Sequence, residues 1–190
     1  MSSRSGARAK GTDGSDFGHR EKVASHYQIS SQNKSRLKTT LFLHVLLFVF
    51  ELAKLSPKIL AYFDVSLKQY INITLPQPAL WEWAWLASIV FALPALHAVQ
   101  KNSITFMKVY LGGIFATAIL PLAFAIAYHS GELSSYIKSE ESKVERFFGV
   151  PVVLVTAGFV GFAFLVHSLS LVFAKNLMDA WAPKKGKKKS

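Results

Sequence analysis

Hydrophobic residues in this chain are gathered into four long blocks, with polar segments between them. The blocks cover residues 39–56, 81–99, 105–128 and 148–174. About 20 helical residues cross a hydrocarbon layer of about 30 Å, so each block is of the right length to span a bilayer. A lone strand would leave its backbone groups unpaired in lipid, which makes helix the expected conformation. The predicted fold is all-α: a polytopic membrane protein with a bundle of four transmembrane helices.

The polar segments are expected to form short loops and flexible basic tails. They are the N-terminal tail 1–38, the loops 57–80, 100–104 and 129–147, and the C-terminal tail 175–190. The N-terminal tail has no early apolar run, so we do not expect a cleavable signal peptide. Residues 16–30 are faintly amphipathic, and both a helix on the membrane surface and a disordered tail are open for them. Pro57 ends the first helix or restarts it, since proline disfavours helix at the preceding residue.

Aromatic and small residues suggest how the helices are placed. Trp81, Trp83 and Trp85 open the second block and suit the aromatic belt at a membrane–water interface. In the third block small residues recur at four-residue spacing, as in Gly113 with Thr117. Such spacing lets helices approach closely, within the bundle or between copies of the chain, so a homo-oligomer is an open expectation.

The basic residues predict the orientation. The two tails, with Lys101 and Lys108 around the second loop, hold sixteen lysines and arginines, whereas loops 57–80 and 129–147 hold five. The positive-inside rule therefore places both termini in the cytosol and these two loops in the lumen. This placement accounts for the formal net charge of +11, so nucleic-acid binding is not expected.

Several classes of chemistry lack the residues that they need. The chain has no cysteine, which excludes disulfides, thiolate metal sites and a cysteine nucleophile. It also lacks a glycine-rich phosphate loop and a Gly-x-Ser-x-Gly nucleophile turn. His44, His97, His129 and His167 lie in or beside the blocks, but no two have the four-residue spacing of metal ligands on one helix face. We expect no catalytic residue, no cofactor and no metal.

Glu51 and Lys54 are charged residues inside the first block, and their three-residue spacing puts them on one helix face. A charge inside a membrane raises a functional hypothesis, which here is a small ion or solute transporter that uses this pair and the membrane histidines. The other interpretation is packing, with the two side chains paired and Lys54 extending toward the interface. A weaker alternative is a lipid-modifying enzyme with a lumenal site near His129 and Glu132, which lacks a full catalytic constellation.

Two kinds of short motif bear on cellular location. Asn72 begins a glycosylation sequon in a predicted lumenal loop and is a candidate modification site. Asn33 begins a second sequon in the predicted cytosolic tail, where modification would contradict the topology. Lys187 and Lys188 are the fourth and third residues from the end, as in the dilysine signal by which the COPI coat retrieves proteins of the endoplasmic reticulum. The alternative is a merely basic tail that attracts anionic lipid.

Defined runs of residues occur at the two ends of the chain. The N-terminal run comprises Gly11, Thr12, Asp13, Gly14, Ser15, Asp16, Phe17, His19, Arg20, Glu21, Val23, Ala24, His26, Tyr27 and Gln28. Later ones are Ala53-Lys54, Val166-His167, Asn176-Leu177, Asp179-Ala180-Trp181 and the lysine-rich end. These residues resemble the signature of the Jagunal family of endoplasmic-reticulum proteins. The middle spans agree with the family mainly in hydrophobic character.

The resemblance implies a non-enzymatic, multi-pass protein of the endoplasmic-reticulum membrane. Members of the family organise that membrane and support vesicle-mediated transport in the early secretory pathway, with links to secretion and, in vertebrates, to neutrophil differentiation. The partners expected from it are the COPI coat and membrane lipids. Residues 11–28 are the candidate docking segment, because so polar a tail has little folding reason for a defined run.

Overall fold

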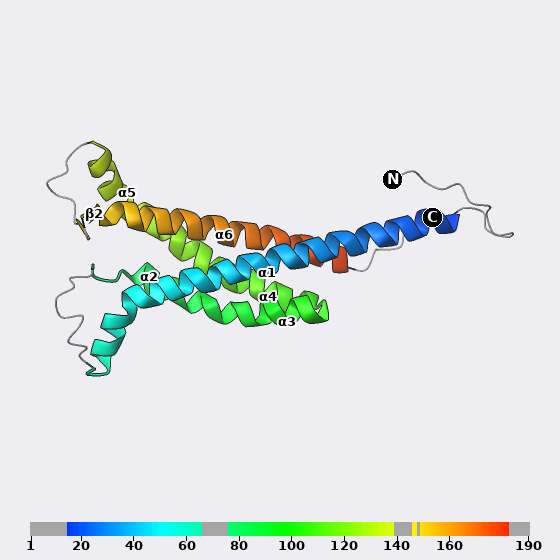
Figure 1. Cartoon of the computed structure of the whole chain (residues 1–190), viewed down its shortest axis with the longest axis horizontal. Coiled ribbons are helices and arrows are strands. Elements are labelled where there is room, and N and C mark those ends of the chain that lie inside the picture. Colours follow the sequence, from blue (N-terminus) through cyan, green and yellow to red (C-terminus); the bar gives the residue numbers. More distant parts are fainter. Residues whose placement is uncertain (1–14, 66–75, 139–145, 148, 183–190) are drawn as a thin grey trace.

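Four helical rods form the computed structural model, which describes residues 15–65, 76–138, 146–147 and 149–182 (Figure 1). The first rod is α1 (Ser15–Tyr62). The second joins α2 (Leu80–Leu86), the 3₁₀ turn η2 (Ala87–Phe91) and α3 (Ala92–Lys101). The third joins α4 (Ile104–Ile114), the π-helical turn η3 (Phe115–Ile119) and α5 (Leu120–Ile137). The fourth is α6 (Val152–Trp181), preceded by the antiparallel pair β1 (Arg146–Phe147) and β2 (Val150–Pro151).

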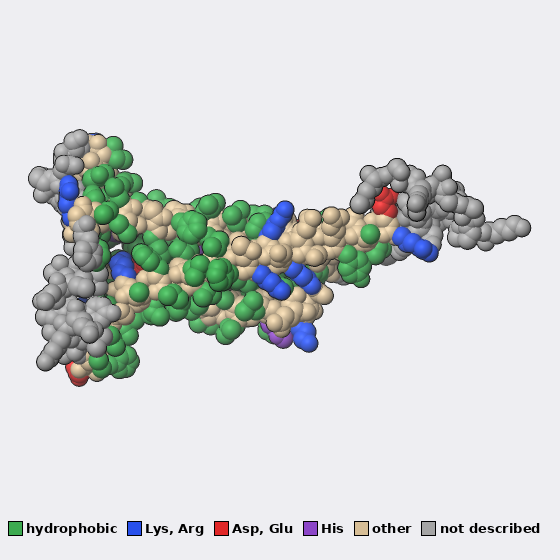
Figure 2. All heavy atoms as spheres, viewed as in Figure 1, with side chains coloured by type: hydrophobic (Ala, Val, Ile, Leu, Met, Phe, Trp, Pro, Cys, Tyr) green, Lys and Arg blue, Asp and Glu red, His purple; other side chains and the backbone are tan. Residues whose placement is uncertain are grey.

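Each of the four rods is long and apolar enough to cross a membrane, which confirms the predicted all-α, four-helix fold. The most extensive packing is between α1 and α6. Buried hydrophobic residues form one core cluster between the rods, and large apolar side chains also cover the outer surface. Figure 2 shows these apolar side chains over much of the bundle, with most of the visible lysines and arginines toward the end where α1 begins. A surface of this kind fits a bilayer with basic residues at one interface.

The two ends of the bundle are different. We call the end where α1 begins and α6 ends the terminal end, and the opposite end the loop end (Figure 1). At the terminal end α3 connects to α4 through a two-residue turn. Asn102 takes a left-handed φ of 51°, which asparagine tolerates, and Ser103 Oγ accepts a hydrogen bond from the Phe106 amide to cap α4. α1 continues well past this turn and projects from the bundle.

Prolines explain the two irregular turns. Proline lacks an amide hydrogen, and its ring crowds the carbonyl four residues earlier. That carbonyl belongs to Val90 in the case of Pro94 and to Thr117 in the case of Pro121, and these residues lie in η2 and η3. The rods therefore change their winding over one turn and continue across the membrane.

Pro57 bends α1 without ending it (Figure 1). The carbonyl that loses its helical partner is that of Ala53, and Ser56 Oγ donates a hydrogen bond to it at 2.8 Å. A neighbouring hydroxyl is one of the groups that satisfy a carbonyl freed by proline in apolar surroundings. The helix then continues to Tyr62, within the segment that the sequence predicts to be a loop.

We expected a flexible tail up to residue 38, but the structure has a helix there from Ser15 onward. The helix begins at Ser15 and runs without a break into the first span. Its polar sequence gives little reason to fold alone, but Asn33 and Leu37 are buried in the bundle. Most helical stability in proteins comes from such tertiary packing, so the contact with α6 explains the helix from about Ser30 onward, and the residues before it extend this helix away from the bundle.

The tryptophans of α2 only partly match the predicted aromatic belt. Trp81 and Trp85 are 2% and 0% exposed, whereas Trp83 is 38% exposed. Residues four apart share a helix face, so Trp81 and Trp85 both point into the bundle. Only Trp83 remains suited to the interface.

Gly113 is the small residue at which two rods approach closely. A Cβ added there would overlap the ring of Phe91 in η2, while the neighbouring Gly112 has no other atoms close to the corresponding position. The tight approach at this predicted small residue therefore lies within the bundle.

Candidate functional site

A regular seam joins α1 to α6. One set of buried positions on each helix recurs at alternating three- and four-residue spacings, the average period of a coiled coil. The set comprises Asn33, Leu37, Thr40, His44, Leu47 and Glu51 on α1, and Val160, Ala163, His167, Ser170, Ala174 and Leu177 on α6, and further buried residues of both helices lie beside it. Polar residues at such positions fix the register of two helices. This seam was not predicted, although the three- and four-residue spacing of the polar residues along the sequence indicates it.

Two histidines meet in the middle of the seam. The ring centroids of His44 and His167 are 4.6 Å apart in an edge-to-face arrangement. His44 Nε2 lies 2.9 Å from Ser88 Oγ, and the Trp85 indole N–H donates to His167 Nε2 at 3.2 Å. All four side chains are buried. The network therefore ties the first, second and fourth rods together through polar contacts in an apolar environment.

A buried ion cluster lies nearer the loop end. Lys54 Nζ is 2.8 Å from Glu82 Oε2 and 3.6 Å from Glu51 Oε1. Both glutamates are buried, and a buried charge without a partner is costly, so one lysine serves two carboxylates. The structure thus brings together the predicted pair and adds Glu82, which sequence reasoning missed. A carboxylate in the first turn of a membrane helix, beside Trp81, was the signal that could have found it.

His129 and Glu132 also come together, on α5. His129 Nδ1 is 2.9 Å from Glu132 Oε2, and the Glu132 side chain is 63% exposed. Trp81 is an edge-to-face neighbour of His129, whereas His97 packs against Phe106 near the α3–α4 turn. Across the part of the chain that the structure describes, no three histidines or carboxylates are grouped so that they could hold a metal ion. One hydrogen-bonded pair does not make a catalytic constellation.

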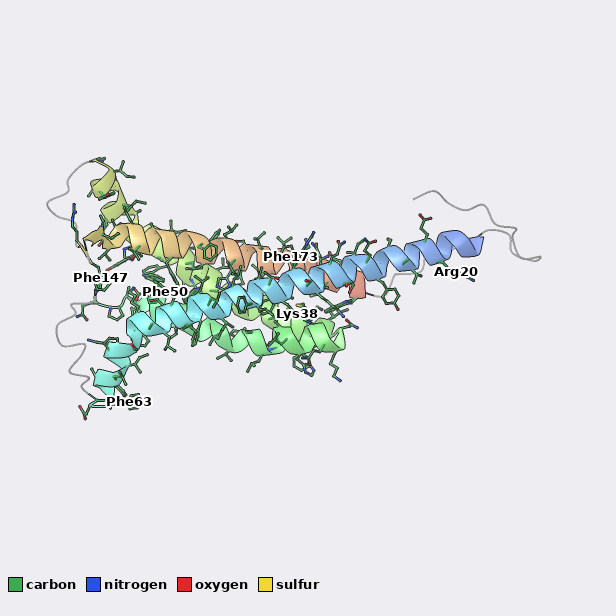
Figure 3. All side chains as sticks on the ribbon, viewed as in Figure 1. Arg20, Lys38, Phe50, Phe63, Phe147 and Phe173 are labelled. Carbon is green, nitrogen blue, oxygen red and sulfur yellow. The ribbon has the colours of Figure 1, made fainter. Side chains whose placement is uncertain are left out.

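α1 and α6 remain in contact at the terminal end. The Trp181 indole N–H donates to Ser30 Oγ at 3.1 Å, and Lys34 Nζ lies 5.7 Å from the centroid of a Trp181 ring. Arg36 lies over the Phe173 ring at 5.8 Å. These contacts hold the first residues of α1 that face α6. The helix continues beyond them toward Arg20, which Figure 3 labels far out on the projection.

Part of the candidate docking segment lies on this projection. Tyr27 and Gln28 are exposed there, and the residues from Ser15 onward belong to α1. Residues 11–14 of the segment lie outside the described residues.

Other predicted sites fall partly within the structure. Asn72, Lys187 and Lys188 lie outside the described residues. Asn33, of the second sequon, is buried on the seam, and its side-chain amide donates to the Ile29 carbonyl at 2.9 Å. This burial shields Asn33 from modification in the folded chain.

Comparison with known proteins identifies the family. The sequence profile described as "Jagunal, ER re-organisation during oogenesis" matches residues 1–185. This chain belongs to the Jagunal family. "Protein jagunal" of Drosophila melanogaster is 37% identical over 187 residues, which cover 95% of both chains. "Protein jagunal homolog" of Caenorhabditis elegans is 33% identical over 97% of this chain and 99% of that protein. "Protein jagunal homolog 1" of Homo sapiens is 31% identical over 95% and 94%.

The Jagunal match confirms the resemblance that the two ends of the chain carry and extends it over all four rods. The family description and the four apolar rods together support a membrane protein with a role in the endoplasmic reticulum. The match covers residues 1–185, so Lys187 and Lys188 lie beyond the matched residues. The dilysine interpretation rests on this chain's own sequence.

Proposed function

We propose that this Jagunal protein is a non-enzymatic, multi-pass protein of the endoplasmic-reticulum membrane with both termini in the cytosol. It supports the organisation of that membrane and vesicle-mediated transport in the early secretory pathway. Secretion, and neutrophil differentiation in a vertebrate, are the processes that we expect to depend on it. The cytosolic parts of the chain recruit the COPI coat, while the bundle holds them at the membrane.

The observation that supports this proposal is the paired exit of α1 and α6 at the terminal end. The Trp181–Ser30 hydrogen bond of 3.1 Å holds the two helices together there, beside Lys34 and Arg36. If each of the four rods crosses the bilayer once, both tails lie on the same side of it, and their basic residues favour the cytosolic side. A helix that projects from this side is suited to presenting motifs to soluble machinery.

The transporter alternative gains less support from the geometry. Lys54 has carboxylate partners in Glu51 and Glu82, and His44 and His167 have hydrogen-bond partners in other rods. Packing and register give each of these polar groups a role without transport.

Replacing both Lys187 and Lys188 with serine is expected to release the protein from the reticulum to the Golgi or cell surface. The reason is that the coat recognises lysines at these distances from a free C-terminus. The matched control replaces Lys184 and Lys185 with serine, which removes the same charge and keeps the motif. Fluorescence microscopy of an N-terminally tagged chain measures the location. A reticular location for both variants would remove the main support for the coat link.

Replacement of residues 11–28 is expected to abolish co-purification of the cytosolic partner that docks on this segment. Two replacements distinguish the role of the native side chains from that of the helix. A Gly/Ser linker removes both, whereas an Ala/Glu/Lys sequence of equal length keeps the helix. Loss in both variants supports docking by the native side chains. Full co-purification with the helical replacement would contradict it, because only the length of the projection would then matter.

A further inference from the structure

A cavity of about 230 Å³ lies at the loop end, between α1, α2, α6 and β1. Its walls are mainly apolar and include Phe50, Val155 and Phe159, and the Phe50 and Phe159 rings stack with centroids 6.0 Å apart. Figure 3 labels two lining residues at this end of the bundle, Phe50 on α1 and Phe147 on β1. Phe50 and Val155 are 54% and 45% exposed on the outer surface. The cavity therefore reaches the side of the bundle that faces lipid.

The charged residues at the polar part of the cavity wall include more carboxylates than ammonium groups. Glu51 and Lys54 line the cavity, and Lys54 lies closer to Glu82 than to Glu51, at 2.8 Å against 3.6 Å. Glu51 Oε1 and Glu82 Oε2 are both fully buried, but Lys54 is within hydrogen-bond distance of Glu82 only, and its 3.6 Å contact with Glu51 is too long for a hydrogen bond. This contacting cluster holds two carboxylates and one ammonium. A second cation at Glu51 would balance the cluster, whereas an anion would add to the excess.

We propose that this cavity binds a membrane amphiphile whose head group carries a protonated amine. The amine donates to Glu51, and the hydrocarbon chain lies along Phe50, Val155 and Phe159 toward the surrounding lipid. Hydrogen bonds between an ammonium and a carboxylate are among the strong ones in proteins, and apolar walls suit the chain. This inference goes beyond the proposed trafficking role and does not depend on it.

The position of the cavity, which opens on the lipid-facing side of the bundle, favours a lipid over a small soluble amine. Pockets that enclose a whole drug-sized molecule usually measure about 300–1,000 Å³, so this smaller cavity takes only the head and the adjoining part of a chain. Glu51 precedes Pro57, where α1 bends, by six residues, or about 9 Å of helix. The partly exposed Trp83 at the same end suits a membrane interface. These two features favour a depth for Glu51 just inside the interface, where a head group meets its chain.

The test is photo-crosslinking of the purified, full-length protein in phosphatidylcholine nanodiscs. Three probes share one C18 chain and one photoreactive group and differ in the head: a sphingoid base, a primary alcohol and a fatty acid. We expect the sphingoid base to label the α1 and α6 peptides at least about tenfold more than the other two probes. Competition with unlabelled phosphatidylethanolamine distinguishes two classes of amine lipid. If it displaces the probe, the site accepts amine lipids with two chains; if it does not, the site accepts those with a single chain.

Three variants locate the labelling. Glu51→Gln leaves Lys54 and Glu82 as a one-to-one pair, so we expect it to fold and to lose labelling about tenfold. Thr156→Phe keeps all three charges, fills the cavity that Thr156 lines and gives the same loss. Glu132→Gln changes an exposed glutamate and keeps the original labelling. Equal labelling by the three probes, or unchanged labelling of both Glu51→Gln and Thr156→Phe, would overturn the proposal.

Discussion

Lys54→Met is expected to lower the free energy of unfolding by about 3–5 kcal/mol, the usual cost of removing one partner from a buried ion pair. The lysine lies 2.8 Å from Glu82 and 3.6 Å from Glu51, and both glutamates are buried. Without it the two carboxylates face each other with no cation from the cluster. Reversible unfolding in mixed micelles measures the loss.

Two further variants test the explanation. Lys58→Met removes a lysine one turn later, whose exposed ammonium makes only a 3.4 Å hydrogen bond to Gln77, so the expected change is within about 0.5 kcal/mol. The triple variant Glu51→Gln, Lys54→Met, Glu82→Gln removes every charge of the cluster and should recover most of the stability. A loss for Lys54→Met no larger than that for Lys58→Met would contradict the structural role of the cluster.

The number and type of the main helices could be predicted because they depend on apolar length alone. Their ends could not. The sequence places a tail before residue 39, but contacts with Phe173 and Trp181 on α6 stabilise the helix there. Likewise α5 continues to Ile137 and α1 passes Pro57, where Ser56 satisfies the freed carbonyl. Each of these outcomes depends on a partner that hydrophobicity along the chain does not identify.

In the candidate site, too, contacts within one helix could be predicted, whereas contacts between rods could not. Glu51 and Lys54 are three residues apart on one helix, so their pairing follows from local geometry. Glu82 joins them from another rod, and the contact of His44 with His167 spans α1 and α6. Such contacts can be predicted only when the alignment of one rod along another is known. A search for heptad spacing would have indicated that alignment. The search for metal-ligand spacing argued only against a metal site and gave no information on how the histidines pack.

Trp85→Ala is expected to cost about 3–5 kcal/mol of unfolding free energy, the range for removal of a large buried aromatic side chain. Trp85 is 0% exposed, its ring centroid is 5.1 Å from that of Phe159, and its indole N–H donates to His167. Inside a membrane, lipid is as apolar as a leucine side chain, so the loss arises from contacts that are not replaced. Thermal or denaturant unfolding of the purified protein measures it.

Trp83→Ala is the matched control, because it removes the same side chain two residues away, where it is 38% exposed. Lipid can fill the space left there, so the expected cost is below about 1 kcal/mol. Trp85→Phe keeps most of the ring and removes the N–H that His167 accepts, and an intermediate loss of about 1–3 kcal/mol should follow. Equal losses for Trp85→Ala and Trp83→Ala would show that Trp85 is not packed between α1 and α6. The predicted order, Trp85→Ala above Trp85→Phe above Trp83→Ala, separates packing, hydrogen bonding and simple exposure in one series.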